Sequence, residues 1–188
     1  FGIAIATKSD LILRDIDILK KINTHSPVIV KFSITCGDDN LSKVIEPNVC
    51  VSSKRFEAIK KLRDAGIYTG VLMMPLLPFI NDTKDNIDKI INQAYKSMAN
   101  FIYPMFGVTL RANQRFYYYT KLRENFPNLV SKYQNLYGDK YVCNSPNYKS
   151  LQSYFEKKCS KLGITYKMED IISEYKSKFE SEQISFDL

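Results

Sequence analysis

The sequence predicts an α/β fold with a parallel sheet, because short apolar runs alternate with amphipathic helical patterns. Four such runs end near positions 7, 35, 74 and 106, and each is followed by turn residues and then by a helical pattern. The spacing of about 30 residues per unit is that of a strand–helix–strand motif. Crossovers of this kind are right-handed and leave the strands parallel. A doubly wound sheet and a barrel both fit this pattern.

The first two units set one side of the expected sheet. A strand over residues 1–7 leads through a polar turn, with Ser9 and Asp10 as N-cap candidates, into a helix over 11–23. The second strand, over 27–35, is rich in Val and Ile, as strands covered on both faces are. Residues 36–47 are expected as a polar loop or a short helical turn.

Glycine and proline mark the limits of the next two units. A helix over 52–65 ends at Gly66, which suits the left-handed position after a helix. The strand over 67–74 runs into Pro75, and prolines end sheet pairing. Residues 81–83 cap a helix over 84–98, and a fourth strand follows over 101–106.

The chain changes character after position 110. Helical patterns extend over 111–125, 129–137, 149–162 and 169–179, with Pro or Gly in the turns between them. We therefore expect three parts: a sheet part over 1–110, a helical region over 111–180 that packs on the sheet, and a frayed tail over 181–188.

Composition excludes several classes of protein. No apolar run approaches the roughly 20 residues that a membrane span needs, so we expect no membrane partner. The four cysteines have no C-x-x-C spacing and His25 is the only histidine, which argues against a zinc site or a Cys/His catalytic pair. Scattered thiols without a signal peptide predict a cytoplasmic protein. Because the chain starts inside a strand without Met, we expect a piece of a longer protein.

Basic charge is concentrated in the second half of the chain. The formal net charge is +7, and residues 111–167 hold 11 Lys/Arg, 3 Asp/Glu and 12 of the 24 Phe/Tyr. Cations for phosphates interleaved with rings for base stacking are what a nucleic-acid surface needs. A solvated basic helix face over an aromatic core fits the same pattern, so both interpretations stay open. The candidate nucleic-acid residues are Arg111, Arg115 and Lys121.

The carboxyl ends of the strands are the expected ligand site, because they meet at one edge of a parallel sheet. They present Lys8, Ser33, Thr35 and Pro75. A lysine with several hydroxyls can hold a carboxylate or a ribose, although Lys8 can equally be solvated beside a capped turn. Three acids follow the second strand, and a solvated loop competes there with a cation site; they are Asp38, Asp39 and Glu46.

Seven segments in order resemble the radical S-adenosylmethionine (SAM) superfamily, within the DNA-repair-photolyase-like group related to spore photoproduct lyase. They are ATKSDLILRD (6–15), FSITCGDD (32–39), IEP (45–47), AGI (65–67), MPLLPFIND (74–82), TLRANQR (109–115) and YVCNSP (141–146). The resemblance implies an incomplete, partial TIM-type (β/α) barrel that carries a [4Fe–4S] cluster and SAM. It also implies a parent enzyme that generates a 5′-deoxyadenosyl radical with an external electron donor, and nucleic acid as a candidate substrate of a DNA-repair-like lyase.

The resemblance assigns roles residue by residue. Lys8 resembles the lysine that contacts the methionyl carboxylate of SAM, Ser33 resembles a serine at the same end, and Pro75 resembles a residue of the adenine side. The C-x-x-x-C-x-x-C cluster motif is absent, and we expect it upstream of Phe1. This chain alone is therefore expected to hold no cofactor and to be inactive. The alternative function is a non-catalytic, basic nucleic-acid-binding module.

Overall fold

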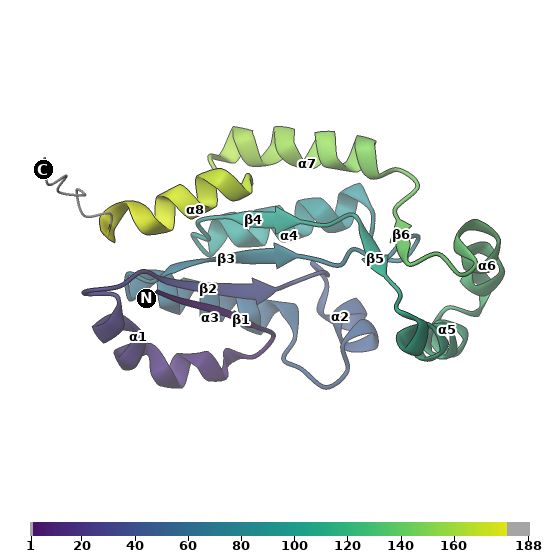
Figure 1. Ribbon diagram of the computed structural model, residues 1–188, viewed down its shortest axis with the longest axis horizontal. Helices are drawn as coiled ribbons and strands as arrows, with labels where there is room; N and C mark the ends of the chain where they lie inside the picture. Colours follow the sequence, from purple (N-terminus) through teal and green to yellow (C-terminus); the bar gives the residue numbers. More distant parts are fainter. Residues whose placement is uncertain (1, 180–188) are drawn as a thin grey trace, which may run out of the picture.

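The computed structural model describes residues 2–179 and contains a four-stranded parallel sheet in the order β1-β2-β3-β4. This confirms the α/β class and the parallel strands (Figure 1). The carboxyl ends of all four strands lie at one edge of the sheet, beside α2 and β5. The strands are β1 (Ile3–Thr7), β2 (Val28–Ser33), β3 (Tyr68–Met73) and β4 (Ile102–Pro104).

The helices of the sheet part follow the expected order with one difference. The pattern over 11–23 begins as a 3₁₀ helix, η1 (Asp10–Asp15), before α1 (Ile16–Ile22). Residues 36–47 contain a short helix, and Gly66 has the expected left-handed conformation with φ 79°. The other helices here are α2 (Asp39–Ile45), α3 (Ser52–Asp64) and α4 (Lys84–Lys96).

The main core lies on one face of the sheet. Alternate strand residues such as Val30 and Phe32 point into it, as the two-residue period of a strand requires. They pack against Ile59 of α3, Ile87 of α4 and Phe155 of α7 (Tyr148–Leu162). This buried apolar surface is the main stabilising contribution to the fold.

The opposite face of the sheet is covered in part by α8 (Met168–Lys176), which ends in the 3₁₀ turn η3 (Ser177–Phe179). A small cluster there includes Ile29, Phe101 and Ile171. The same face carries Lys31, whose neighbours in register are Ala6 and Gly70. The lysine is half-buried, and the ring of Phe101 lies close against Gly70.

A second, smaller core lies beyond the strand ends. It is formed by α5 (Ala112–Asn125), η2 (Pro127–Leu129) and α6 (Val130–Tyr137), with Tyr133 fully buried at its centre. β5 (Gly107–Thr109) pairs in antiparallel fashion with β6 (Val142–Asn144). The region expected to be helical therefore also contains a strand, and the pairing crosses position 110.

The last two helices pack back on the sheet part, since α7 joins the main core and Thr165 bridges Phe101 beside β4. The tail expected over 181–188 lies outside the described residues. In the part of the chain that the structure describes, no helix combines the length and the apolar character needed to cross a membrane.

Candidate ligand site at the strand ends

Lys8 lies directly after β1, at the edge where the strands end. The turn around it is ordered by its neighbours: Thr7 Oγ1 accepts from the Ser9 amide at 3.0 Å, and Ser9 Oγ caps η1 by accepting from the Leu11 amide at 3.2 Å. The N-cap prediction for Ser9 is thus confirmed. None of these turn contacts involves the side chain of Lys8.

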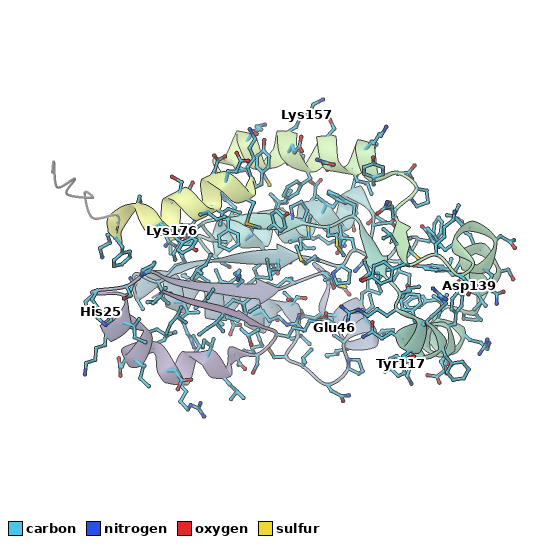
Figure 2. The ribbon with its side chains drawn as sticks, viewed as in Figure 1. His25, Glu46, Tyr117, Asp139, Lys157 and Lys176 are labelled. Carbon is cyan, nitrogen blue, oxygen red and sulfur yellow. The ribbon has the colours of Figure 1, made fainter. Side chains whose placement is uncertain are left out.

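Lys8 is paired with an acid rather than left in solvent. Its Nζ lies 2.8 Å from Glu46 Oε1, and its side chain is 40% exposed. Glu46 is only 10% exposed, and its second oxygen lies 2.6 Å from Nη1 of Arg55, whose side chain is completely buried. Figure 2 shows Glu46 inside the protein near the end of α2. The three charges alternate and sum to +1, an excess that suits an anionic ligand.

Arg55 connects Lys8 and Ser33, two of the four residues predicted to hold the ligand. Its Nη1 donates to the carbonyl of Ser33 at 2.6 Å, and its Nε donates to the carbonyl of Cys50 at 2.7 Å. The thiol of Cys50 in turn donates to the backbone carbonyl of Lys8 at 3.0 Å. One buried guanidinium therefore fixes the end of β2 directly and the end of β1 through Glu46 and Cys50.

Two buried polar atoms next to this arrangement make no hydrogen bond with any described residue. They are Nη2 of Arg55 and Oγ of Ser52, in the first turn of α3. A buried charge is expensive unless it is paired. Glu46 provides this pairing as the counter-ion of Arg55.

The other predicted site residues differ in where they lie. Ser33 is the last residue of β2 and is half-buried, and it stands next to Lys8 when the register of Thr7 with Phe32 is continued by one step. Pro75 follows β3 and is half-buried. Lys8 and Ser33 therefore both lie at the carboxyl ends of two neighbouring strands.

Thr35 belongs to the interior. Its side chain is buried, its Oγ1 lies 3.7 Å from the thiol of Cys36, and its carbonyl accepts from the amides of Asn81 and Asn86 at 3.0 and 2.8 Å. The structure therefore does not bring the Thr35 hydroxyl to the edge where Lys8 lies.

Of the three acids after β2, Asp38 is exposed as a solvated loop predicts, whereas Asp39 and Glu46 are partly buried. Asp38 caps α2 by accepting from the Leu41 amide at 3.0 Å. Asp39 ties α2 to α3, because its carboxylate accepts from both the amide and the hydroxyl of Ser53, at 2.9 and 2.6 Å. With Glu46 bound to Lys8 and Arg55, each acid has a structural partner. No group of three metal-ligating side chains occurs within residues 2–179.

Arg55 was not predicted from the sequence as a site residue, although it contacts both Ser33 and Glu46. A signal was present: Arg55, Ile59 and Leu62 are spaced i, i+4 and i+7, which places them on one helix face. An arginine on the buried face of a helix requires a buried acceptor, and Glu46 is the nearest acid upstream in the sequence.

The cysteines do not suit an iron–sulfur cluster. Cys36, Cys143 and Cys159 are buried and Cys50 is half-buried, and all four are free thiols. Burial raises the pKa of Cys159 to about 12 and also raises the pKa of Cys36 and of Cys143. Since a cluster needs thiolates gathered at one place, these residues do not fit it. Lys8 fits a ligand carboxylate, such as that at the methionyl end of SAM. Its ammonium has three N–H donors, and Glu46 uses one of them.

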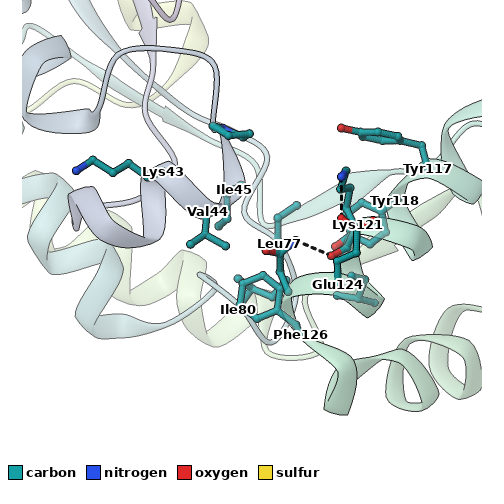
Figure 3. A pocket seen from close by; sticks show the side chains of 13 residues that line it. Lys43, Val44, Ile45, Leu77, Ile80, Tyr117, Tyr118, Lys121, Glu124 and Phe126 are labelled. Atoms are coloured by element: carbon teal, nitrogen blue, oxygen red, sulfur yellow. Dashed lines mark hydrogen bonds and ion pairs between the residues drawn. The ribbon is translucent and has the colours of Figure 1, made fainter.

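A cavity of about 360 Å³ lies between α2, the segment after β3 and α5 (Figure 3). Its wall is mainly apolar and includes Val44, Ile45, Leu77 and Phe126. Lys121 is held at the rim by Glu124, at 2.7 Å. Lys121 and Glu124 neutralise each other, which leaves Lys43 of α2 as the one lining charge without an opposite charge in the lining.

The predicted nucleic-acid residues have different environments. Arg111 is exposed at the start of α5, and Lys121 lies 5.9 Å from the ring centre of Tyr117. Arg115 is occupied: it pairs with Asp139 Oδ1 at 3.0 Å and donates to the backbone of the loop around that residue. Arg115 therefore fixes a loop and is not free to bind phosphate.

Two parts of the basic, aromatic segment lie apart on the molecule. Figure 2 shows Lys157 of α7 and Tyr117 of α5 at different edges of the molecule. Tyr117 is 65% exposed, whereas Tyr118 and Tyr119 pack against Tyr133 in the smaller core. Of these three consecutive tyrosines, two therefore pack in the smaller core and one faces solvent.

Comparison with known proteins gives relatives without a known activity. The chain is 30% identical to an uncharacterized protein of Mycobacterium tuberculosis over 135 residues, which covers 72% of this chain and 39% of that protein. It is 36% identical to an uncharacterized protein of Methanocaldococcus jannaschii over 125 residues, which covers 66% of this chain and 44% of that protein. An uncharacterized protein of Acidianus two-tailed virus is 26% identical over 96 residues, or 51% of this chain and 31% of that protein.

No family model matches the chain, and no solved structure gives a significant match. The chain spans less than half the length of the relatives named above. Because those relatives are uncharacterized, the chemistry of this chain has to be inferred from its own residues.

Proposed function

We propose that the chain supplies the SAM-binding strand ends of a cytoplasmic radical SAM enzyme, within a partial (β/α) barrel of TIM type. The single observation that carries the proposal is the link between Lys8 and Ser33 through one buried arginine, Arg55. Two adjacent strand ends that resemble SAM-binding positions thus share one rigid support. SAM bound at a [4Fe–4S] cluster supplies a 5′-deoxyadenosyl radical when an external donor reduces the cluster.

The residues of this chain would bind and orient one end of the cofactor. The Lys8 ammonium would neutralise the methionyl carboxylate, and the Ser33 hydroxyl would donate to the same end. Pro75 would provide an apolar contact on the adenine side. Cluster ligands would come from a segment outside these 188 residues, since the cysteines present do not fit that role.

The test uses the full-length protein, reconstituted anaerobically with iron and sulfide. Under reducing conditions we expect 5′-deoxyadenosine to accumulate from SAM, and Lys8→Met to reduce its formation by at least tenfold. Absence of SAM cleavage in the reconstituted protein would refute the proposal. Cleavage that is unchanged in Lys8→Met would refute the role of Lys8.

Nucleic-acid binding by α5 is the second candidate, either as a non-catalytic module or as the substrate contact of the enzyme. One observation favours it: Phe116 and Tyr117 are 82% and 65% exposed, on α5, which follows Arg111 and carries Lys121. Exposed rings beside cations can stack bases and neutralise phosphates.

Binding to single-stranded DNA should weaken steeply as salt rises, and Tyr117→Ala should weaken it several-fold. The matched control is Tyr95→Ala, a 55% exposed tyrosine on α4. Binding that is absent, independent of salt or equally sensitive to both substitutions would count against this candidate.

A further inference from the structure

We infer that Glu46 is a positioning residue for a carboxylate-bearing ligand, and that it acts by holding the Lys8 ammonium while Arg55 holds Glu46 in place. The inference rests on the proposed function and extends it to two residues that do not themselves touch the cofactor. Two ion pairs carry the inference. Lys8 Nζ lies 2.8 Å from Glu46 Oε1, and Arg55 Nη1 lies 2.6 Å from Glu46 Oε2.

Glu46 is a fixed support and not a gate that swings away from Lys8. Its two carboxylate oxygens serve different partners, so Oε2 stays with Arg55 while Oε1 faces Lys8. Arg55 has no exposed side-chain surface, and its Nη2 lacks a partner among the described residues. Removing the carboxylate would leave a buried guanidinium without a counter-ion, which is unfavourable.

Lys8 keeps the capacity to bind a second anion. An ammonium has three donors, and Glu46 uses one of them. The side chain is 40% exposed, so part of it is open to a ligand. The Glu46 charge is balanced by Arg55, and the charge of Lys8 is therefore left over for a ligand carboxylate. Holding a flexible lysine in advance also reduces the entropy lost on binding.

Arg55 also holds the backbone of Ser33. Its bond to the Ser33 carbonyl fixes the last residue of β2, and its bond to the Cys50 carbonyl fixes the residue whose thiol meets the Lys8 backbone. Lys8 and Ser33 thus receive their relative position from one buried ion. This arrangement predicts that Glu46 affects a ligand only through the group that Lys8 binds.

The experiment compares two probes on the reconstituted full-length protein by calorimetry. SAM carries the amino-carboxylate, and 5′-methylthioadenosine carries the adenosine and sulfur without it. We expect Glu46→Gln and Lys8→Met each to weaken SAM about tenfold or more and to leave 5′-methylthioadenosine within about twofold. The double variant should bind SAM no more weakly than Lys8→Met, because Glu46 acts through Lys8.

Two further variants protect the test against misfolding and nonspecific charge effects. Glu46→Asp keeps a counter-ion for Arg55 but shortens the reach to Lys8, and we expect it to weaken SAM selectively. Glu57→Gln makes the same chemical change on α3 at an exposed pair with Lys54, and we expect no effect on either probe.

The outcomes separate the two proposals. If the wild-type protein does not bind SAM, or if Lys8→Met binds it normally, the proposed function fails. If Lys8→Met loses SAM selectively but both Glu46 variants bind it normally, only the positioning role fails. Tighter SAM binding by Glu46→Gln would also overturn it, because Glu46 would then compete with the ligand for Lys8. Additive losses in the double variant would show that Glu46 acts independently of Lys8.

Discussion

The guanidinium of Arg55 is completely buried, and its Nη1 lies 2.6 Å from the Glu46 carboxylate. Replacing Arg55 with Met would remove the counter-ion and leave Glu46 at 10% exposure without its main partner. We expect the free energy of unfolding to fall by about 3–5 kcal/mol, as when one member of a buried pair is lost. Urea denaturation measures this free energy of unfolding for the variant and the wild type.

The control for this prediction is Lys54→Met, one position earlier on α3. Lys54 pairs with Glu57 in solvent, and exposed pairs contribute at most about 1 kcal/mol. Equal losses in the two variants, or a loss below about 1 kcal/mol for Arg55→Met, would contradict a central structural role for the buried pair.

Asp82 should make stability depend on pH. Burial raises the pKa of Asp82 above its ordinary value, even though its carboxylate accepts from Ser145 Oγ at 2.6 Å and from the Phe79 amide at 2.7 Å. Since the folded pKa exceeds the unfolded one, this contribution to stability is complete below about pH 4 and is lost as pH rises through the folded pKa. Asp82→Asn does not titrate. Its stability relative to the wild type should therefore increase from about pH 4 to pH 7.

Denaturation of both proteins at several pH values measures this difference, with the exposed Asp85→Asn as the control. A difference between Asp82→Asn and the wild type that stays constant with pH would contradict the raised pKa.

Tyr133 should be sensitive to loss of a single hydroxyl. Its OH donates to the Pro78 carbonyl at 2.7 Å and accepts from Tyr118 at 2.8 Å, inside the smaller core. Tyr133→Phe leaves two buried polar groups unpaired, so we expect a loss of about 1–3 kcal/mol in thermal or urea unfolding. Tyr95→Phe removes a hydroxyl from an exposed ring and should change stability by less than about 0.5 kcal/mol.

Gly70 should not tolerate a side chain. A Cβ at this position would lie 2.5 Å from the Phe101 carbonyl oxygen and 2.5 Å from a ring carbon of Phe101, which is itself buried. We expect Gly70→Ala to destabilise the protein by about 1–3 kcal/mol through overpacking, measured by urea denaturation.

Gly66→Ala gives the comparison for Gly70→Ala, since nothing lies within 4 Å of its Cβ and only its φ of 79° opposes the change. It should cost about 1–2 kcal/mol. A Gly70→Ala variant as stable as the wild type would show that β3 and Phe101 can separate.

The period of apolar residues was sufficient to predict the sheet and most helices. The expected strands over 27–35 and 67–74 correspond to β2 and β3, and Gly66 ends α3 where its φ requires glycine. The β5–β6 pair escaped prediction because each strand has only three residues. Pairing between segments more than thirty residues apart leaves no periodic signal.

The candidate site was predictable in its position but not in its partners. Lys8 and Ser33 follow from the rule that ligands bind where parallel strands end. The pairing with Glu46 does not, because a carboxylate in a polar loop has the same sequence signature whether it is solvated or buried. The partners of Arg115 were not predictable either: its place in a basic segment does not reveal its ion pair with Asp139.

The shared use of Arg55 by the core and by the strand ends limits how this sequence can vary. A hydrophobic residue of similar volume often replaces a buried ion with little loss when both partners change together. Here the partner carboxylate also faces Lys8, so a double replacement that preserved the core would still leave the lysine unsupported. Screening a library at positions 46 and 55 for thermal stability alone would therefore select folded proteins in which Lys8 has lost its fixed neighbour.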